Sequence, residues 1–284
     1  MAHHKDHGNR PATPEERAAI LAAAGSLIDN SDEAVEAAAE KNLGATPEER
    51  ASKIASLKKL TLPYNLIGLV GAFIPFFMGS KDLGSVVFYI VWPLIGFGLM
   101  AFNGSLISVF SDPRRSDYPN ISVGFLATVF VSMLVMLNNY QVLSYDNFWL
   151  PAAILSAVFF VLLFLIDKHG GENHSVAGKV VAYVAIAMVF GSGSVMNLNF
   201  ASDRSTPQLY QATIIGERTS TSSRGAVSYY ITVAPWGPVH DNGELTVDKQ
   251  VFDATYLGAV VNVDLYPGLF HIPAYAVSTM RGIR

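Results

Sequence analysis

The chain contains no cysteine among its 284 residues. This absence excludes disulfides, cysteine-ligated zinc, iron–sulfur clusters and thiolate nucleophiles. Charge is also scarce, because only 15% of the residues are Asp, Glu, Lys or Arg, whereas soluble domains have about 25%. The net charge of −4 is not accompanied by a basic patch, which argues against nucleic acid as a partner.

The shortage of charge is concentrated in the middle of the chain. Residues 61–201 hold five basic and six acidic residues, whereas residues 1–60 hold eight and ten. The uncharged gaps are about 20 residues or longer, the length that a helix needs to cross about 30 Å of hydrocarbon. This pattern excludes a wholly soluble protein. It predicts a membrane α-helical bundle of five transmembrane helices, at about 62–80, 85–110, 121–140, 148–166 and 177–199.

Connections that are rich in basic residues alternate along the chain with connections that have few or none. Basic residues are frequent before the first span, present between the second and third at Arg114 and Arg115, absent from 138–147, and present again at Lys168 and Lys179. The positive-inside rule then places the N-terminus in the cytoplasm and the tail outside. The acid-rich start is unlike a signal or transit peptide. We therefore expect a multi-pass protein of the bacterial inner membrane with a periplasmic C-terminus.

Residues 1–60 are predicted to form a cytoplasmic helical arm. The heptapeptide ATPEERA occurs at 12–18 and 45–51, and its Thr, Pro and second Glu can form an N-cap, a first helical position and a capping box. The repeat indicates either a docking arm or two helices that share a good starting sequence. An apolar stripe on the first helix is too thin for a core of its own, so its members are candidate partner contacts: Ile20, Leu21, Leu27 and Ile28.

Residues 205–284 change to a period of two and predict a small all-β domain of the OB or SH3-like kind. Asn242-Gly243 is typical of a tight hairpin turn. The expected strands are 208–217, 226–234, 244–248, 258–265 and 271–277. The aromatic residues of this tail are expected either in its core or on a contact face, and the candidate partner contacts are Trp236, Tyr229 and Tyr256.

The same tail carries a resemblance. Its motifs are Tyr229-Tyr230, Pro235-Trp236-Gly237, the strand 244–247, Gly258, Val261-Asn262-Val263, Pro267-Gly268-Leu269 and Ile272-Pro273-Ala274-Tyr275. This string is similar to the tail of uncharacterised bacterial inner-membrane proteins with a small C-terminal β domain. The resemblance covers about 70 residues of the 284. It implies a membrane location and no particular activity or site residue.

Polar residues within the predicted spans have two possible roles. Every Asp, Glu, Lys and Arg of this region falls in a connection or at the end of a span, whereas transport or proton pumping normally needs an ionisable side chain within the spans. Asn103 and Ser105 are expected deep in the second span, and Gly191, Gly193 and Asn197 lie where a Gly-Ser-Gly-Ser run interrupts the fifth. Small and amide-bearing residues of this kind serve helix packing or line a pore for a neutral ligand.

No enzymatic motif is present. The chain has no Gly-x-Ser-x-Gly elbow, no His-Glu-x-x-His helix and no phosphate-binding loop. His240 and Asp241 are neighbours, so on a strand they point to opposite faces. We therefore predict no catalytic or metal-ligating residue and name no cofactor. The leading hypothesis is a non-enzymatic accessory or scaffold subunit that contacts the lipid bilayer and other membrane subunits. The alternative is an oligomeric channel or transporter for a neutral or lipidic solute.

Overall fold

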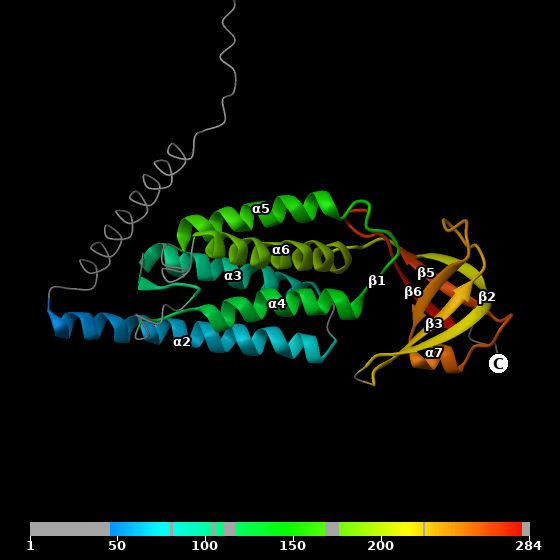
Figure 1. The fold of residues 1–284 in the computed structure, drawn as a ribbon, viewed down its shortest axis with the longest axis horizontal. Helices are drawn as coiled ribbons and strands as arrows, with labels where there is room; N and C mark the ends of the chain where they lie inside the picture. The colour runs from blue at the N-terminus through cyan, green and yellow to red at the C-terminus, as the bar shows by residue number, and fades with distance from the viewer. Residues whose placement is uncertain are drawn as a thin grey trace, which may run out of the picture.

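A computed structural model describes residues 46–79, 82–103, 106–110, 118–167, 176–223 and 225–279. A bundle of helices is joined at one end to an antiparallel β domain (Figure 1). Five helices are long and apolar enough to cross a membrane, which confirms the predicted number of candidate spans. They are α2 (Pro47–Phe77), α3 (Leu83–Asn103), α4 (Ser122–Asn139), α5 (Trp149–Ile166) and α6 (Val176–Ala201).

Helix α2 begins at the predicted capping box. The Glu49 backbone N–H donates to the Thr46 hydroxyl at 3.2 Å, and the Glu49 carboxylate accepts from the Thr46 backbone N–H. The helix then runs without a break through Pro63 to Phe77. The helix that the second heptapeptide copy was expected to start and the first span are therefore one continuous helix. The first heptapeptide copy and the apolar stripe lie outside the described residues.

The second span is shorter than predicted. It was expected to reach residue 110, but α3 ends at Asn103. Residues 106–110 are irregular, and Leu106, Ile107 and Val109 are buried against the helices. Ser108 forms an isolated parallel bridge with Asn120. An uncharged apolar run has the same composition whether it continues a helix or packs as an irregular segment. Composition therefore did not reveal where α3 ends.

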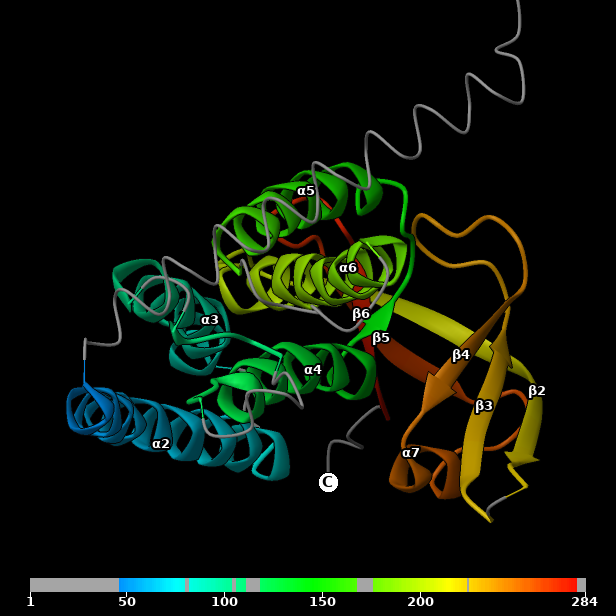
Figure 2. The ribbon, with the colours of Figure 1, turned by 60° about the vertical axis from the view of Figure 1, so that its left-hand side comes forward.

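The five helices pack with α4 and α6 side by side at the centre. Helix α2 lies along α4, α5 lies along α6, and α3 contacts all four from one side (Figure 2). Glycines permit the close crossings, because a Cβ on Gly68 would meet the backbone of Gly124, and one on Gly191 would meet Ser156 and the carbonyl of Ala152.

The outside of the bundle is apolar, and several polar side chains are buried inside it beside a mainly apolar core. Thr128, Ser132, Asn197 and Asn199 are buried in its interior. Large apolar side chains cover its outside, among them Leu66 and Val70 of α2, Leu94 of α3, Phe130 and Leu134 of α4, Val158 and Leu165 of α5, and Val181 and Met188 of α6.

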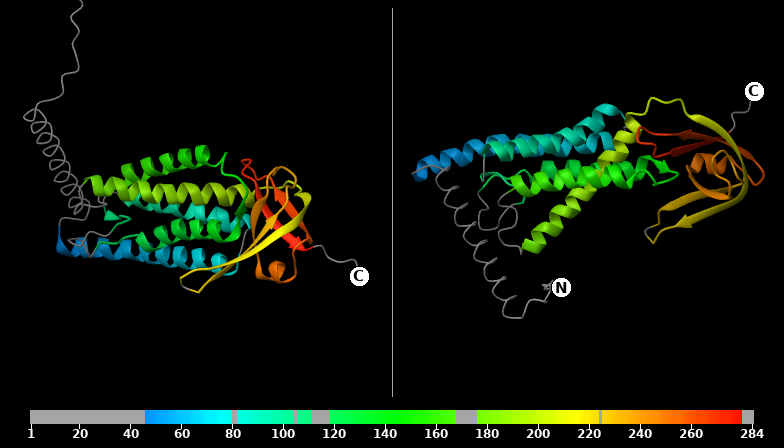
Figure 3. Two further views of the ribbon diagram at one scale, coloured as in Figure 1. Left: turned by 45° about the vertical axis from the view of Figure 1, so that its right-hand side comes forward. Right: turned by 90° about the horizontal axis from the view of Figure 1, so that it is seen from above.

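The β domain is a six-stranded antiparallel sheet that curls into a near-barrel (Figure 3). Its strands are β1 (Gln141–Val142), β2 (Gln208–Thr221), β3 (Val227–Val233), β4 (Gly243–Val247), β5 (Val260–Tyr266) and β6 (Ala274–Thr279), in the order β1-β6-β5-β2-β3-β4. The first half of β2 pairs with β5 and the second half with β3, with a register shift between Ile214 and Gly216. This shared strand bends the sheet until the Thr246 N–H of β4 donates to the Tyr275 hydroxyl of β6 at 3.1 Å.

Three details of the β domain differ from the sequence-based expectation. Strand β1 and the short helix α7 (Lys249–Asp253) were not predicted. The predicted turn at Asn242-Gly243 is wrong, because Gly243 pairs with Val233 inside the ladder. The chain reverses at Gly237 instead, where φ is +44° and Trp236 and Val239 exchange backbone hydrogen bonds of 2.9 and 2.8 Å. The buried Trp236 anchors the reversal there, and tertiary packing overrides the local Asn-Gly preference.

Candidate functional site

The junction between the bundle and the β domain is built from segments that are distant in sequence. Strand β1 follows directly after α4 and pairs with β6, through Gln141 with Tyr275 and Val142 with Ala274. The Leu143 N–H donates to the Pro273 carbonyl at 2.8 Å. The connection between α4 and α5 thereby becomes the edge of the sheet, which ties the two parts of the molecule through their backbones.

Asn199 joins the end of α6 to the loop at 267–273. Its Nδ2 donates to the Ile272 carbonyl at 2.9 Å, and its Oδ1 accepts from the Phe270 N–H at 2.7 Å. Its backbone carbonyl accepts from the Leu269 N–H at 2.9 Å. Asn199 is fully buried, so these bonds form away from competing water and fix the position of the loop.

The loop at 267–273 has a specialised backbone to make these contacts. Gly268 has a φ of +77°, and a Cβ there would collide with the Asn199 side chain. His271 has a φ of +57°, the only positive φ of a non-glycine residue in the described part of the chain. Its carbonyl accepts from Asn147 Nδ2 at 2.9 Å. Ile272 is fully buried in an apolar cluster with Met136, Phe148, Val195 and Met196.

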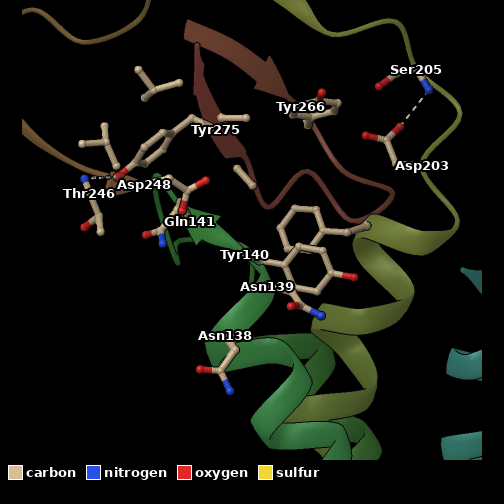
Figure 4. A pocket seen from close by; sticks show the side chains of 15 residues that line it. Asn138, Asn139, Tyr140, Gln141, Asp203, Ser205, Thr246, Asp248, Tyr266 and Tyr275 are labelled. Atoms are coloured by element: carbon tan, nitrogen blue, oxygen red, sulfur yellow. Dashed lines mark hydrogen bonds between the residues drawn. The ribbon is translucent and has the colours of Figure 1, made fainter. Parts of the chain in front are cut away.

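A cavity of about 510 Å³ lies at this junction (Figure 4). It is formed by the end of α4, strand β1, the segment after α6, the end of β4 and strand β6. This volume is in the range of small-molecule sites. The lining side chains that are polar or aromatic are Asn138, Asn139, Tyr140, Gln141, Phe200, Asp203, Ser205, Thr246, Asp248, Tyr266 and Tyr275.

The cavity has an acidic lining. Asp203 and Asp248 contribute carboxylates, and no Lys or Arg is among the lining residues. The Asp203 carboxylate accepts from the Ser205 N–H at 2.8 Å and the Gly268 N–H at 2.9 Å. Burial by itself raises the pKa of Asp203, but the hydrogen bonds from Ser205 and Gly268 outweigh it and hold the pKa below its ordinary value. Asp203 is therefore ionised at neutral pH.

Asp248 differs from Asp203 because it has no structural task in the helix that follows it. It occupies the N-cap of α7, yet its side chain makes no capping hydrogen bond. Aromatic rings complete the lining. Tyr140 stacks on Phe200 with ring centroids 4.3 Å apart, and Tyr266 is partly exposed.

The predicted bundle residues are placed separately from this cavity. Asn103 is the last residue of α3, and its Nδ2 donates to the Leu99 carbonyl of the same helix at 2.8 Å. Asn103 therefore lies at the end of a helix. The sequence-based expectation that it lies deep within the second span is wrong. Ser105 lies outside the described residues. Asn197 is fully buried and donates from Nδ2 to the Ser132 carbonyl at 2.9 Å, which joins α6 to α4.

Gly191 and Gly193 lie in a continuous part of α6, so the expected interruption of the fifth span is wrong. They permit close packing on two different sides of the helix. A Cβ on Gly191 would meet Ser156 of α5, whereas a Cβ on Gly193 would meet Ser132 and Met133 of α4. The glycines thus allow α6 to fit between its two neighbours.

The three predicted aromatic contacts of the tail have different environments. Trp236 is only 4% exposed and belongs to the core of the β domain, so it is not on a contact face. Tyr229 is half-buried, with its ring centroid 5.1 Å from that of Phe252. Tyr256 is 70% exposed beside the exposed Leu257 and stays a candidate contact. The arm residues Ile20, Leu21, Leu27 and Ile28 lie outside the described residues.

Sequence reasoning missed the residues that build the junction. Asn147, Asn199, Asp203 and Asp248 were not singled out from the sequence. One usable signal was the position of Asp203, which is the first charge after the fifth uncharged gap. The partners of Asn199 were not visible, because they lie 71 and 73 residues away.

Comparisons with known proteins do not assign the site. No family model, no curated protein and no solved structure matches this chain. Within the described residues, no group of three or more His, Asp or Glu side chains is arranged to hold a metal ion.

Proposed function

We propose that the bundle is embedded in the bacterial inner membrane, with the start of α2 in the cytoplasm and the β domain in the periplasm. Its apolar exterior, with a few polar side chains buried inside, suits a lipid solvent. Helices α2, α4 and α6 run toward the β domain and α3 and α5 run away from it (Figure 1). Five passes therefore separate the start of α2 from the β domain, in agreement with the basic residues of the connections.

The length of α2 supports this placement. Its 31 residues measure about 46 Å, whereas the hydrocarbon core is about 30 Å thick. The excess length is at the charged start of the helix, where Glu48, Arg50 and Lys53 are exposed. In the proposed orientation this part projects into the cytoplasm.

The proposal extends to the type of β domain. Strand β2 is long and bent, α7 stands between β4 and β5, and β4 and β6 face each other across the gap in the barrel. Apart from the short β1, which comes from the helical bundle, the strands β2 to β6 form a five-stranded, partly open barrel, which is the form of the OB type.

The function that this geometry supports best is that of a non-enzymatic accessory or scaffold subunit in a larger membrane complex. The observation that carries it is the junction, where Asn199 and the β1–β6 pairing hold the β domain in one orientation on the bundle. A domain that is fixed in this way presents its far surface at a constant height above the membrane. The exposed Tyr256–Leu257 pair belongs to the connection from α7 to β5. Figure 1 shows this connection at the end of the domain away from the helices.

The channel alternative loses two of the features that suggested it. Asn103 lies at a helix end, and α6 is continuous through residues 191–194. Asn103 forms a hydrogen bond within its own helix, and Gly191 and Gly193 permit close contacts between α6 and its neighbours. We therefore place the scaffold role first.

Purification in mild detergent tests the scaffold role. A photoreactive residue in place of Tyr256 should crosslink the protein to a partner subunit, and the partner should co-purify in stoichiometric amount. The same photoreactive residue in place of Val158, on the outer face of α5, is the matched control and should not crosslink to that subunit. A monodisperse monomer without crosslinks at position 256 would contradict the proposal.

A further inference from the structure

We propose that the junction cavity binds a ligand through an ammonium group, of the kind carried by a phosphatidylethanolamine headgroup or by a free amine. This goes beyond the scaffold role, which assigns no ligand to the protein. The inference rests on the charge, the aromatic lining and the position of the cavity.

The charge of the lining selects a cation. The two carboxylates belong to opposite walls, Asp203 following α6 and Asp248 following β4, and no basic side chain lines the space between them (Figure 4). Asp203 keeps its negative charge through two backbone hydrogen bonds. Asp248 is free of any capping bond in α7, so its carboxylate can accept from an ammonium group. Charge-assisted hydrogen bonds of this kind are about twice as strong as neutral ones.

The aromatic rings fit the same ligand class. Tyr140 and Tyr266 lie between the two carboxylates in the view of Figure 4. The face of a tyrosine ring attracts ammonium groups by cation–π interaction. Gln141 adds a side-chain amide to the wall at β1. This amide can donate a hydrogen bond to the hydroxyl or phosphate oxygen that the same ligand carries near its ammonium group.

The position of the cavity indicates where such a ligand would come from. Asn138, Asn139 and Phe200 line it from the ends of α4 and α6. In the proposed membrane these helix ends lie at the outer surface, where lipid headgroups are found. A lipid headgroup can therefore reach the cavity from the bilayer, and a free amine can reach it from the aqueous side.

Two arms of one experiment separate these sources, with the full chain in nanodiscs. In the first arm, native mass spectrometry compares retained phosphatidylethanolamine with retained phosphatidylglycerol. In the second arm, calorimetry measures binding of ethanolamine and spermidine to protein in phosphatidylglycerol nanodiscs. The variant is Asp248→Asn, which removes one charge without removing a structural hydrogen bond. The matched control is Asp241→Asn, an exposed aspartate that does not line the cavity.

The expected result is that Asp248→Asn lowers ammonium binding at least about tenfold, whereas Asp241→Asn leaves it unchanged. Selective loss of retained phosphatidylethanolamine identifies the lipid as the source. Loss confined to the calorimetric arm identifies a free amine, and both results support the proposal. Equal binding by the wild type and Asp248→Asn in both arms would overturn it. Neither arm needs a partner subunit, so the outcome is independent of the scaffold role.

Discussion

Replacing Asn199 with leucine should release the β domain from the bundle while both parts stay folded. The substitution removes the hydrogen bonds to the Ile272 carbonyl and the Phe270 N–H, and it leaves both backbone groups without their buried partner. Losses of this kind cost about 1–3 kcal/mol each. We expect the junction to lose about 3 kcal/mol, which corresponds to about a hundredfold population shift toward the detached state.

Hydrogen exchange measures this release directly. The amides of Leu269 and Phe270 should lose about a hundredfold of their protection in Asn199→Leu, whereas the amides of strand β3 should keep theirs. Asn197→Leu is the matched control, since Asn197 lies two residues earlier on α6 and bonds to Ser132 inside the bundle. Unchanged protection at Leu269 and Phe270 in Asn199→Leu would show that Asn199 does not hold the domain.

Replacing Asn65 with leucine should destabilise the bundle itself. The first residues of α4 have no side-chain cap of their own, because Ile121 occupies the N-cap. Asn65, from the middle of α2, accepts from the Gly124 N–H and donates to the Asn120 carbonyl, both at 2.8 Å. A helix end in an apolar environment must have its free N–H groups satisfied. We expect Asn65→Leu to lower the free energy of unfolding by about 2 kcal/mol.

Unfolding of the detergent-solubilised protein tests this cap, with Asn103→Leu as the control. Asn103 donates only to its own helix, to the Leu99 carbonyl, so its loss should change the free energy of unfolding by less than about 1 kcal/mol. Equal effects of the two substitutions would mean that the contact between α2 and α4 contributes no more than a bond within one helix.

The helices could be predicted because the energetic penalty that defines them is local. A charge in mid-bilayer is costly wherever it occurs, so uncharged gaps located all five candidate spans. The Thr46 capping box was equally visible, since its two partners are three residues apart. The end of α3 was not visible, because Leu106, Ile107 and Val109 are apolar and buried without being helical.

The junction could not be predicted because its contacts are long-range. Strand β1 has two residues and no alternating pattern of its own, and it exists only because β6 offers a partner. The hydrogen bond from Asn147 to His271 spans 124 residues of sequence. The two aspartates of the cavity stand in separate polar connections. Only the fold brings them to one space.

The central claim is that the middle of the chain lies in lipid and separates its two ends. Because the chain has no cysteine of its own, labelling of single introduced cysteines tests this claim most directly. Single cysteines can replace Ser52 on α2, Val158 on α5 and Ser223 on the β2–β3 connection, all exposed in the structure. An impermeant maleimide on intact spheroplasts should label Ser223→Cys at once and Ser52→Cys only after lysis. Val158→Cys should resist the reagent until the protein is denatured. Labelling of positions 52 and 223 from the same side, or ready labelling at position 158, would contradict the account.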